Sequence, residues 1–147
     1  MPKFTSSFLF PDINVWLALS YQRHIHYPSA RSWFELLDQQ RVCFCRFTQL
    51  GLLRLLTTAA VMGEDEVLTQ NEAWSVYDRW IEDDRVVYVE ESSALEPRFR
   101  SLTRNERPTP KDWGDSFLYA FAETADLRLV TFDQAFRQKG ANVLLLQ

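Results

Sequence analysis

The chain has few of the residues that mark disulfide-stapled, repetitive or linker-rich proteins. Its 147 residues include only two cysteines, four glycines and six prolines. Two cysteines cannot build a disulfide framework, and no repeat or low-complexity tract is present to suggest a linker. With 46% hydrophobic residues, a chain of this length can bury a large core without such help. We therefore expect a single domain over residues 1–147.

Long apolar runs and a secretion signal are also missing. The longest uncharged run, Ile13 to Gln22, is far too short to span a bilayer. The N-terminal residues lack a basic segment followed by an apolar stretch and a cleavage site. We expect a cytoplasmic protein with no membrane segment.

Soft metal ligands are scarce. Cys43 and Cys45 lie two residues apart in an expected strand, a spacing that suits neither a local disulfide nor a four-ligand zinc site. We expect both to be core thiols. His24 and His26 have no pattern of carboxylates or thiols around them, and we expect them on the surface.

The net charge of −4 argues against a general nucleic-acid coat protein, but the charges are unevenly distributed. Residues 63–96 carry eleven acidic residues and two arginines. The balance then reverses, because residues 97–111 contain one acid, Glu106, and five basic residues: Arg98, Arg100, Arg104, Arg107 and Lys111. A solvated helix face with a loop explains such a run, and a phosphate-binding surface explains it equally well.

Apolar runs alternate with helical spacing along the chain. We expect strands at residues 8–10, 42–47, 86–89, 127–131 and 143–146. We expect helices at residues 13–19, 28 to about 40, 48–56, 73–81 behind a capping box of Thr69 and Glu72, 95–102 and 113–123. Strands separated by helices pair in parallel, with helices on both faces of the sheet. The sequence thus predicts a three-layer α/β/α fold with a central, mostly parallel sheet.

Three aspartates occupy matching places in this arrangement. Asp12 and Asp133 each follow an expected strand, and Asp115 lies in the first turn of a helix that would begin at the same edge. Ligand sites in such sheets lie at the carboxyl ends of the strands. Clustered carboxylates repel one another, and a divalent cation with a preference for oxygen ligands, Mg²⁺ or Mn²⁺, would relieve that repulsion. Any one of these acids could instead be a helix cap.

Four segments together resemble the ordered motifs of PIN-domain nucleases, and in particular VapC toxins. They are Asp12-Ile13-Asn14 after the first strand, the helix over residues 47–56, the helix over residues 113–122, and residues 129–136 around Asp133. The resemblance covers essentially the whole chain. It implies a metal-dependent endoribonuclease that cleaves RNA, usually forms a homodimer, and is held inactive by a cognate VapB-type antitoxin.

The resemblance also assigns roles to residues. Asp12, Asp115 and Asp133 match the metal-binding aspartates of the family, and Asn14 and Thr131 match polar positions that support them. A further catalytic acid of the family falls on Gln49, an amide that can offer an oxygen but no negative charge. An alternative therefore remains open, in which the chain is a catalytically weakened PIN-fold module that binds RNA or protein.

The sequence leaves the roles of the arginines and tryptophans open. The basic residues of 97–111 would hold phosphates that flank the cleaved bond, whereas Arg54 could reach the site, an antitoxin carboxylate or a buried acid. We expect the five tryptophans mainly to pack in the core, and expect Trp16 and the helix with Trp33 and Phe34 to supply a dimer surface. A receiver-type phosphoacceptor domain is disfavoured, because Asp12 is a lone acid after the first strand.

Overall fold

A computed structural model describes residues 8–138, 140 and 142–147 of the chain. Its five strands form one sheet in the order β3-β2-β1-β4-β5, and every neighbouring pair is parallel. The strands are β1 (Phe8–Pro11), β2 (Arg41–Phe44), β3 (Val86–Tyr88), β4 (Arg128–Thr131) and β5 (Val143–Leu145). All five coincide with the predicted strands to within a few residues.

Helical segments connect each strand to the next. They are α1 (Ile13–Ser20), α2 (Tyr27–Glu35), α3 (Arg46–Leu56), α4 (Ala59–Met62), α5 (Gln70–Glu82), α6 (Leu95–Thr103), α7 (Asp112–Thr124) and the 3₁₀ helix η1 (Gln134–Gln138). The expected capping box at the start of α5 is confirmed, because Thr69 and Glu72 each accept a hydrogen bond from the backbone N–H of the other. None of the helices in the described part of the chain is long and apolar enough to cross a bilayer.

The second helix is shorter than its sequence predicts. It ends at Glu35 instead of near Gln40, and the next residue, Leu36, is 85% exposed. Leucines at positions 36 and 37 continue the apolar pattern, but the chain must leave the helix there to reach β2 at Arg41. The spacing of apolar residues does not show where the loop to β2 must begin.

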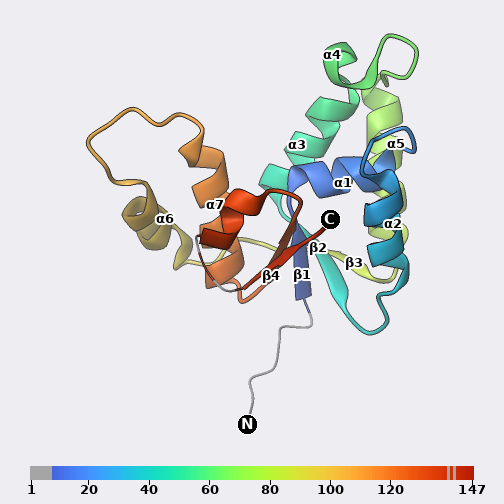
Figure 1. Cartoon of the computed structure of the whole chain (residues 1–147). Coiled ribbons are helices and arrows are strands. Elements are labelled where there is room, and N and C mark those ends of the chain that lie inside the picture. Colours follow the sequence, from blue (N-terminus) through green and yellow to red (C-terminus); the bar gives the residue numbers. More distant parts are fainter. Residues whose placement is uncertain (1–7, 139, 141) are drawn as a thin grey trace.

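The sheet is covered on both faces, as the three-layer prediction requires (Figure 1). Neighbouring residues of a strand point to opposite faces. Leu9 packs in a core with α1, α2, α3 and α5, whereas Phe10 packs in a second core with α6 and α7. Cys43 and Cys45 lie in this second core as free thiols, as predicted.

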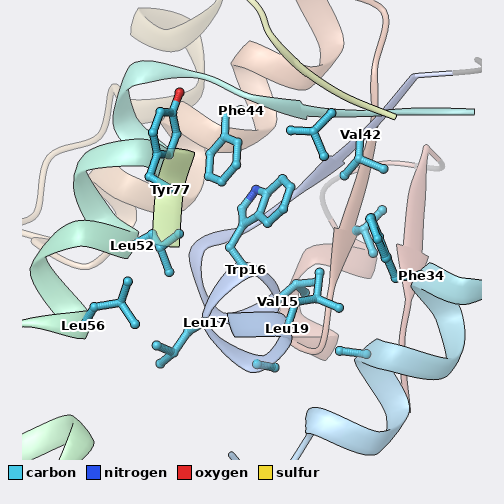
Figure 2. Close-up of a cluster of buried hydrophobic side chains, with 14 of the residues drawn as sticks. Val15, Trp16, Leu17, Leu19, Phe34, Val42, Phe44, Leu52, Leu56 and Tyr77 are labelled. Carbon is cyan, nitrogen blue, oxygen red and sulfur yellow. The ribbon is translucent and has the colours of Figure 1, made fainter. Parts of the chain in front are cut away.

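Trp16 lies at the centre of the first core. Its ring stacks on Phe44 of β2 at a centroid distance of 3.8 Å, with Leu52 and Tyr77 nearby (Figure 2). Trp16 is 0% exposed and Phe34 is 2% exposed. Trp16 and Phe34 therefore cannot contribute to the expected dimer surface, since both pack inside one copy of the chain, whereas a dimer contact of α2, the helix that carries Phe34, stays a prediction.

Candidate active site

The strand order of this sheet reverses between β1 and β4. The chain passes from β1 to β2 to β3 in one direction and then returns to place β4 on the other side of β1. Ligands of open parallel sheets bind where the strand order reverses in this way, at the carboxyl ends of the strands. Asp12 follows β1 directly, and its backbone N–H donates to the Val130 carbonyl of β4 at 2.9 Å. Asp133 follows β4 after one intervening residue.

Asp12 is a buried carboxylate that accepts hydrogen bonds from neighbouring residues. As the N-cap of α1, it accepts a hydrogen bond from the backbone N–H of Val15 through Oδ1 at 3.1 Å. The Thr131 hydroxyl donates to its other oxygen, Oδ2. Only 6% of Asp12 is exposed, and these hydrogen bonds hold its carboxylate in one orientation.

The pKa of Asp12 is raised from 3.8 to about 6, mainly by burial and to a smaller extent by the negative charge of nearby Asp133. The hydrogen bonds from Thr131 and Val15 favour the charged form and lower this pKa. The effect of burial is larger, because these hydrogen bonds replace only part of the hydration that the carboxylate loses. A cation bound beside these two carboxylates would favour the charged form of both.

Thr131 connects the two aspartates. Its hydroxyl donates to Asp12 and accepts the backbone N–H of Asp133 at 3.0 Å. Asp133 itself is exposed, and its Oδ1 caps the start of η1 by accepting the backbone N–H of Ala135 at 2.9 Å. The side chain of Thr131 is fully buried, which leaves it no role at the surface and fits the supporting role that we expected.

Asp115 lies in the first turn of α7, as predicted, and this turn is at the carboxyl edge of the sheet. The α7 helix places Phe121 on Phe10 of β1 at 5.0 Å and Phe117 on Phe47, which follows β2, at 5.1 Å. Even so, within residues 8–138, 140 and 142–147 no three His, Cys, Asp or Glu side chains are placed so that they could hold one metal ion. The structure pairs Asp12 with Asp133, and the three-aspartate metal site stays a prediction.

Gln49 and Asn14 make contacts of a different kind. The Oε1 atom of Gln49 accepts a hydrogen bond from Arg46 at 2.6 Å, and its side chain also bonds Tyr77 of α5. These partners orient Gln49 in the first turn of α3, and its catalytic role stays a prediction. Asn14 donates its backbone N–H to Asp12, while the residue itself is exposed.

The predicted phosphate-binding residues divide into paired and unpaired groups. Arg98 forms an ion pair with Glu123, and Arg100 pairs with Glu96. Three basic residues form no ion pair with any residue that the structure describes: Arg104, Arg107 and Lys111. Arg54 is exposed and lines a groove between α3 and α5.

Two aromatic features near this edge were not anticipated. Trp113 is 58% exposed beside α6, which contradicts the expectation of core packing for this tryptophan. The ring of His26 stacks on that of Phe132 at a centroid distance of 4.3 Å. Phe132 is the residue between Thr131 and Asp133 in the sequence. Neither could be found from local sequence, because each depends on how a distant segment packs.

The fold and the site together define a doubly wound α/β domain with paired carboxylates at its switch point. Residues 9–142 match the PIN domain family, and the chain belongs to this family. It is 42% identical over 139 residues to Ribonuclease VapC41 of Mycobacterium tuberculosis, covering 92% of this chain and 95% of the relative. It is 26% identical over 130 residues to Ribonuclease VapC44 of the same species, covering 84% of each.

Solved structures show the same fold at low sequence identity. Mycobacterium tuberculosis VapC20, a Sarcin-Ricin loop cleaving toxin, superposes with a TM-score of 0.64 at 14% identity, covering 90% of this chain and 95% of that one. VapBC2 from Rickettsia felis, bound to a DNA fragment from its promoter, gives a TM-score of 0.66 at 13% identity, with coverage of 94% and 96%. These likenesses confirm the predicted three-layer fold.

Proposed function

We propose that this chain is an endoribonuclease, the toxin of a VapBC-type toxin-antitoxin pair. The observation that carries this function is the buried carboxylate of Asp12 beside Asp133 at the switch point of a PIN-domain sheet. The chain is similar to relatives named ribonucleases over most of their length, and this similarity supports RNA as the substrate.

The donor set fits a divalent cation that prefers oxygen. Asp12 and Asp133 offer carboxylate oxygens only, and neither thiols nor histidines contact Asp12 among the described residues. Such donors suit Mg²⁺ or Mn²⁺ better than zinc. A bound cation would supply Lewis-acid polarisation of the scissile phosphodiester. We propose Asp12 and Asp133 as its ligands, with Asp115 completing the set.

The chain's own residues prepare this site. Val15 and Thr131 orient the carboxylate of Asp12, and the same threonine holds the backbone at Asp133. Burial of Asp12 removes water from one wall of the crevice, so a charge placed there acts through a low dielectric. The basic residues after α6 would hold RNA phosphates without reading the bases.

Cleavage of total RNA in the presence of Mg²⁺ or Mn²⁺ tests this function. The wild type should cleave RNA, and the isosteric variants Asp12→Asn, Asp115→Asn and Asp133→Asn should lose activity, while the exposed control Asp38→Asn should not. Equal cleavage by all five proteins would refute the assignment. If the wild type cleaves no RNA and gives no Mn²⁺ signal in calorimetry, the weakened binding module is the better description.

We further propose a VapB-type antitoxin partner, a homodimeric assembly and a cytoplasmic site of action, where RNA is available. Co-purification with the product of the neighbouring reading frame, followed by loss of cleavage in the complex, tests the partner. Light scattering tests the dimer, and the mass of a single chain at micromolar concentration would refute it.

A further inference from the structure

A groove with a volume of about 600 Å³ lies between α6 and the start of α7. The two helices pack against each other and form the far side of the molecule from α2 and α5 (Figure 1). The floor of the groove is apolar and its rim is charged. Six of its lining residues carry the argument: Leu95, Phe99, Arg100, Arg104, Trp113 and Phe117.

The aromatic side chains of the groove form a cluster of tilted and edge-to-face rings. The ring of Phe99 lies 6.0 Å from that of Trp113 and 5.9 Å from that of Phe117. Phe117 continues inward to Phe121 at 6.0 Å, so the cluster is anchored in the second core. Trp113 is at the outer end, where 58% of it remains exposed. Most of the tryptophan ring remains in water, so the favourable free energy of burying it is not gained until another flat group covers it.

The charges of the rim suit a polyanion. Arg104 lines the groove and forms no ion pair with any described residue, and Arg107 and Lys111 follow in the loop that closes this end. Arg100 is already paired with Glu96, and Glu91 also lines the groove. Residues 104–111 carry three basic side chains that form no ion pair with described residues and one acid, Glu106, so this segment has a net positive charge.

The groove continues toward the acidic site. Asn105 lines both this groove and a second hollow that is bounded by Lys111, Asp112 and Asp115. A chain that enters beside Trp113 would thus pass Lys111 and reach Asp115, the aspartate that we propose as the third ligand.

We propose that this groove binds an unpaired base of the RNA substrate, with Trp113 as the stacking platform and Arg104 on the adjacent phosphate. The proposal rests on the endoribonuclease function proposed above and adds to it the place where the substrate is held. Every base has a flat π-face, so a tryptophan platform binds single-stranded RNA with little sequence preference. The pairing of an aromatic platform with a free arginine matches a base and its phosphate, whereas a purely apolar partner would leave Arg104 unpaired.

Binding measurements in a nuclease-inactive background test the proposal. In full-length protein carrying Asp12→Asn, fluorescence anisotropy would compare a short labelled single-stranded RNA with an abasic strand of the same length. Trp113→Ala should weaken binding of the RNA about tenfold and leave binding of the abasic strand unchanged. Trp74→Ala is the matched control, because Trp74 is also exposed, at 46%, but lies on α5. It should change neither affinity.

Arg104→Gln should separate the two contacts. It should weaken binding of both strands and make the affinity less dependent on salt, because one phosphate contact is lost. Trp113→Phe keeps a smaller ring and should recover part of the affinity, which also shows that the loss in Trp113→Ala is not caused by misfolding. Equal weakening of both strands by Trp113→Ala would overturn the stacking role.

Two further outcomes would overturn the proposal in different ways. If Trp113→Ala binds RNA as tightly as its parent and the wild type cleaves RNA, the groove has no role in RNA binding. The proposed endoribonuclease function would then stand. If Trp113→Ala binds RNA normally but is no longer inhibited by the antitoxin, the groove is a protein-docking surface. A wild type that neither binds nor cleaves RNA would instead overturn the function on which the proposal rests.

Discussion

Asp12 should make the metal-free protein less stable at neutral pH than its Asp12→Asn variant. The pKa of Asp12 is about 6 in the folded chain, compared with an ordinary value of 3.8, mainly because the carboxyl group is buried. The folded protein therefore holds the proton more tightly than the unfolded chain does. The favourable contribution of protonated Asp12 is fully present below pH 3.8 and is lost as the pH rises through about 6.

The size of the effect follows from the pKa difference. One pKa unit corresponds to about 1.4 kcal/mol, so the difference between 3.8 and about 6 corresponds to about 3 kcal/mol of unfolding free energy. An asparagine at position 12 can still accept the N–H of Val15, but its amide cannot accept the Thr131 hydroxyl, a loss of about 1 kcal/mol. Well above pH 6, Asp12→Asn should thus be more stable than wild type by about 2 kcal/mol, or about 4–8 °C in Tm for a chain of this size.

Urea unfolding in the presence of a chelator, repeated across the pH range, measures the difference. The advantage of Asp12→Asn should disappear as the pH falls below about 4, where the wild-type carboxyl group is neutral in both states. Adding Mn²⁺ at neutral pH should stabilise the wild type but not the variant, because ligand binding stabilises only the folded protein that binds it. Asp38→Asn, at an exposed loop position, should follow the wild type throughout.

Two results would refute this reasoning. An Asp12→Asn variant that is less stable than wild type at neutral pH would show that the two hydrogen bonds outweigh burial. A difference that stays constant from acid to neutral pH would show that the Asp12 carboxyl group does not titrate differently on folding.

Other contacts give further expectations. Thr131→Val, which keeps the shape and removes the hydroxyl, should lower the unfolding free energy by about 1–3 kcal/mol, because it leaves buried Asp12 short of a donor; Thr131→Ser should restore most of it, and equal stability of all three proteins would contradict the assigned bond. Thr69→Ala should cost about 1 kcal/mol of stability through loss of the α5 cap and leave RNA cleavage unchanged, so a loss of cleavage in a folded variant would be unexpected. Gln49→Glu should strengthen the bond to Arg46, and we expect the new carboxylate to stay paired with this arginine and to leave Mn²⁺ affinity unchanged; calorimetry that shows a clear gain in affinity would place residue 49 in the metal site.

Much of the fold was determined by local sequence. Parallel strands covered on both faces are almost continuously apolar, which is why residues 8–10, 42–47 and 127–131 could be predicted as strands. The capping box of Thr69 and Glu72 could also be predicted from local sequence, because all its atoms lie within one turn of helix. The end of α2 could not, because it depends on where β2 must begin.

The site shows the same division. That Asp12 and Asp133 lie at the carboxyl ends of strands was implied by the sequence, since each acid directly follows an apolar run. Only the tertiary structure brought β4 beside β1, so that the Thr131 hydroxyl could join the two aspartates across the order reversal. Burial of a carboxylate, and hence the rise in the pKa of Asp12, arises from the packing of residues far apart in the chain.

Helical spacing shows which side chains share a face, but it does not show whether another element covers that face. Tertiary packing decided that Trp16 would be enclosed and that Trp113 would remain open beside α6. It also decided that Gln49 would bond Arg46 and Tyr77. The sequence determined by itself which elements form and where its acids stand along them; which of those side chains meet was decided by distant segments, because contact depends on position in space and periodicity only on position along the chain.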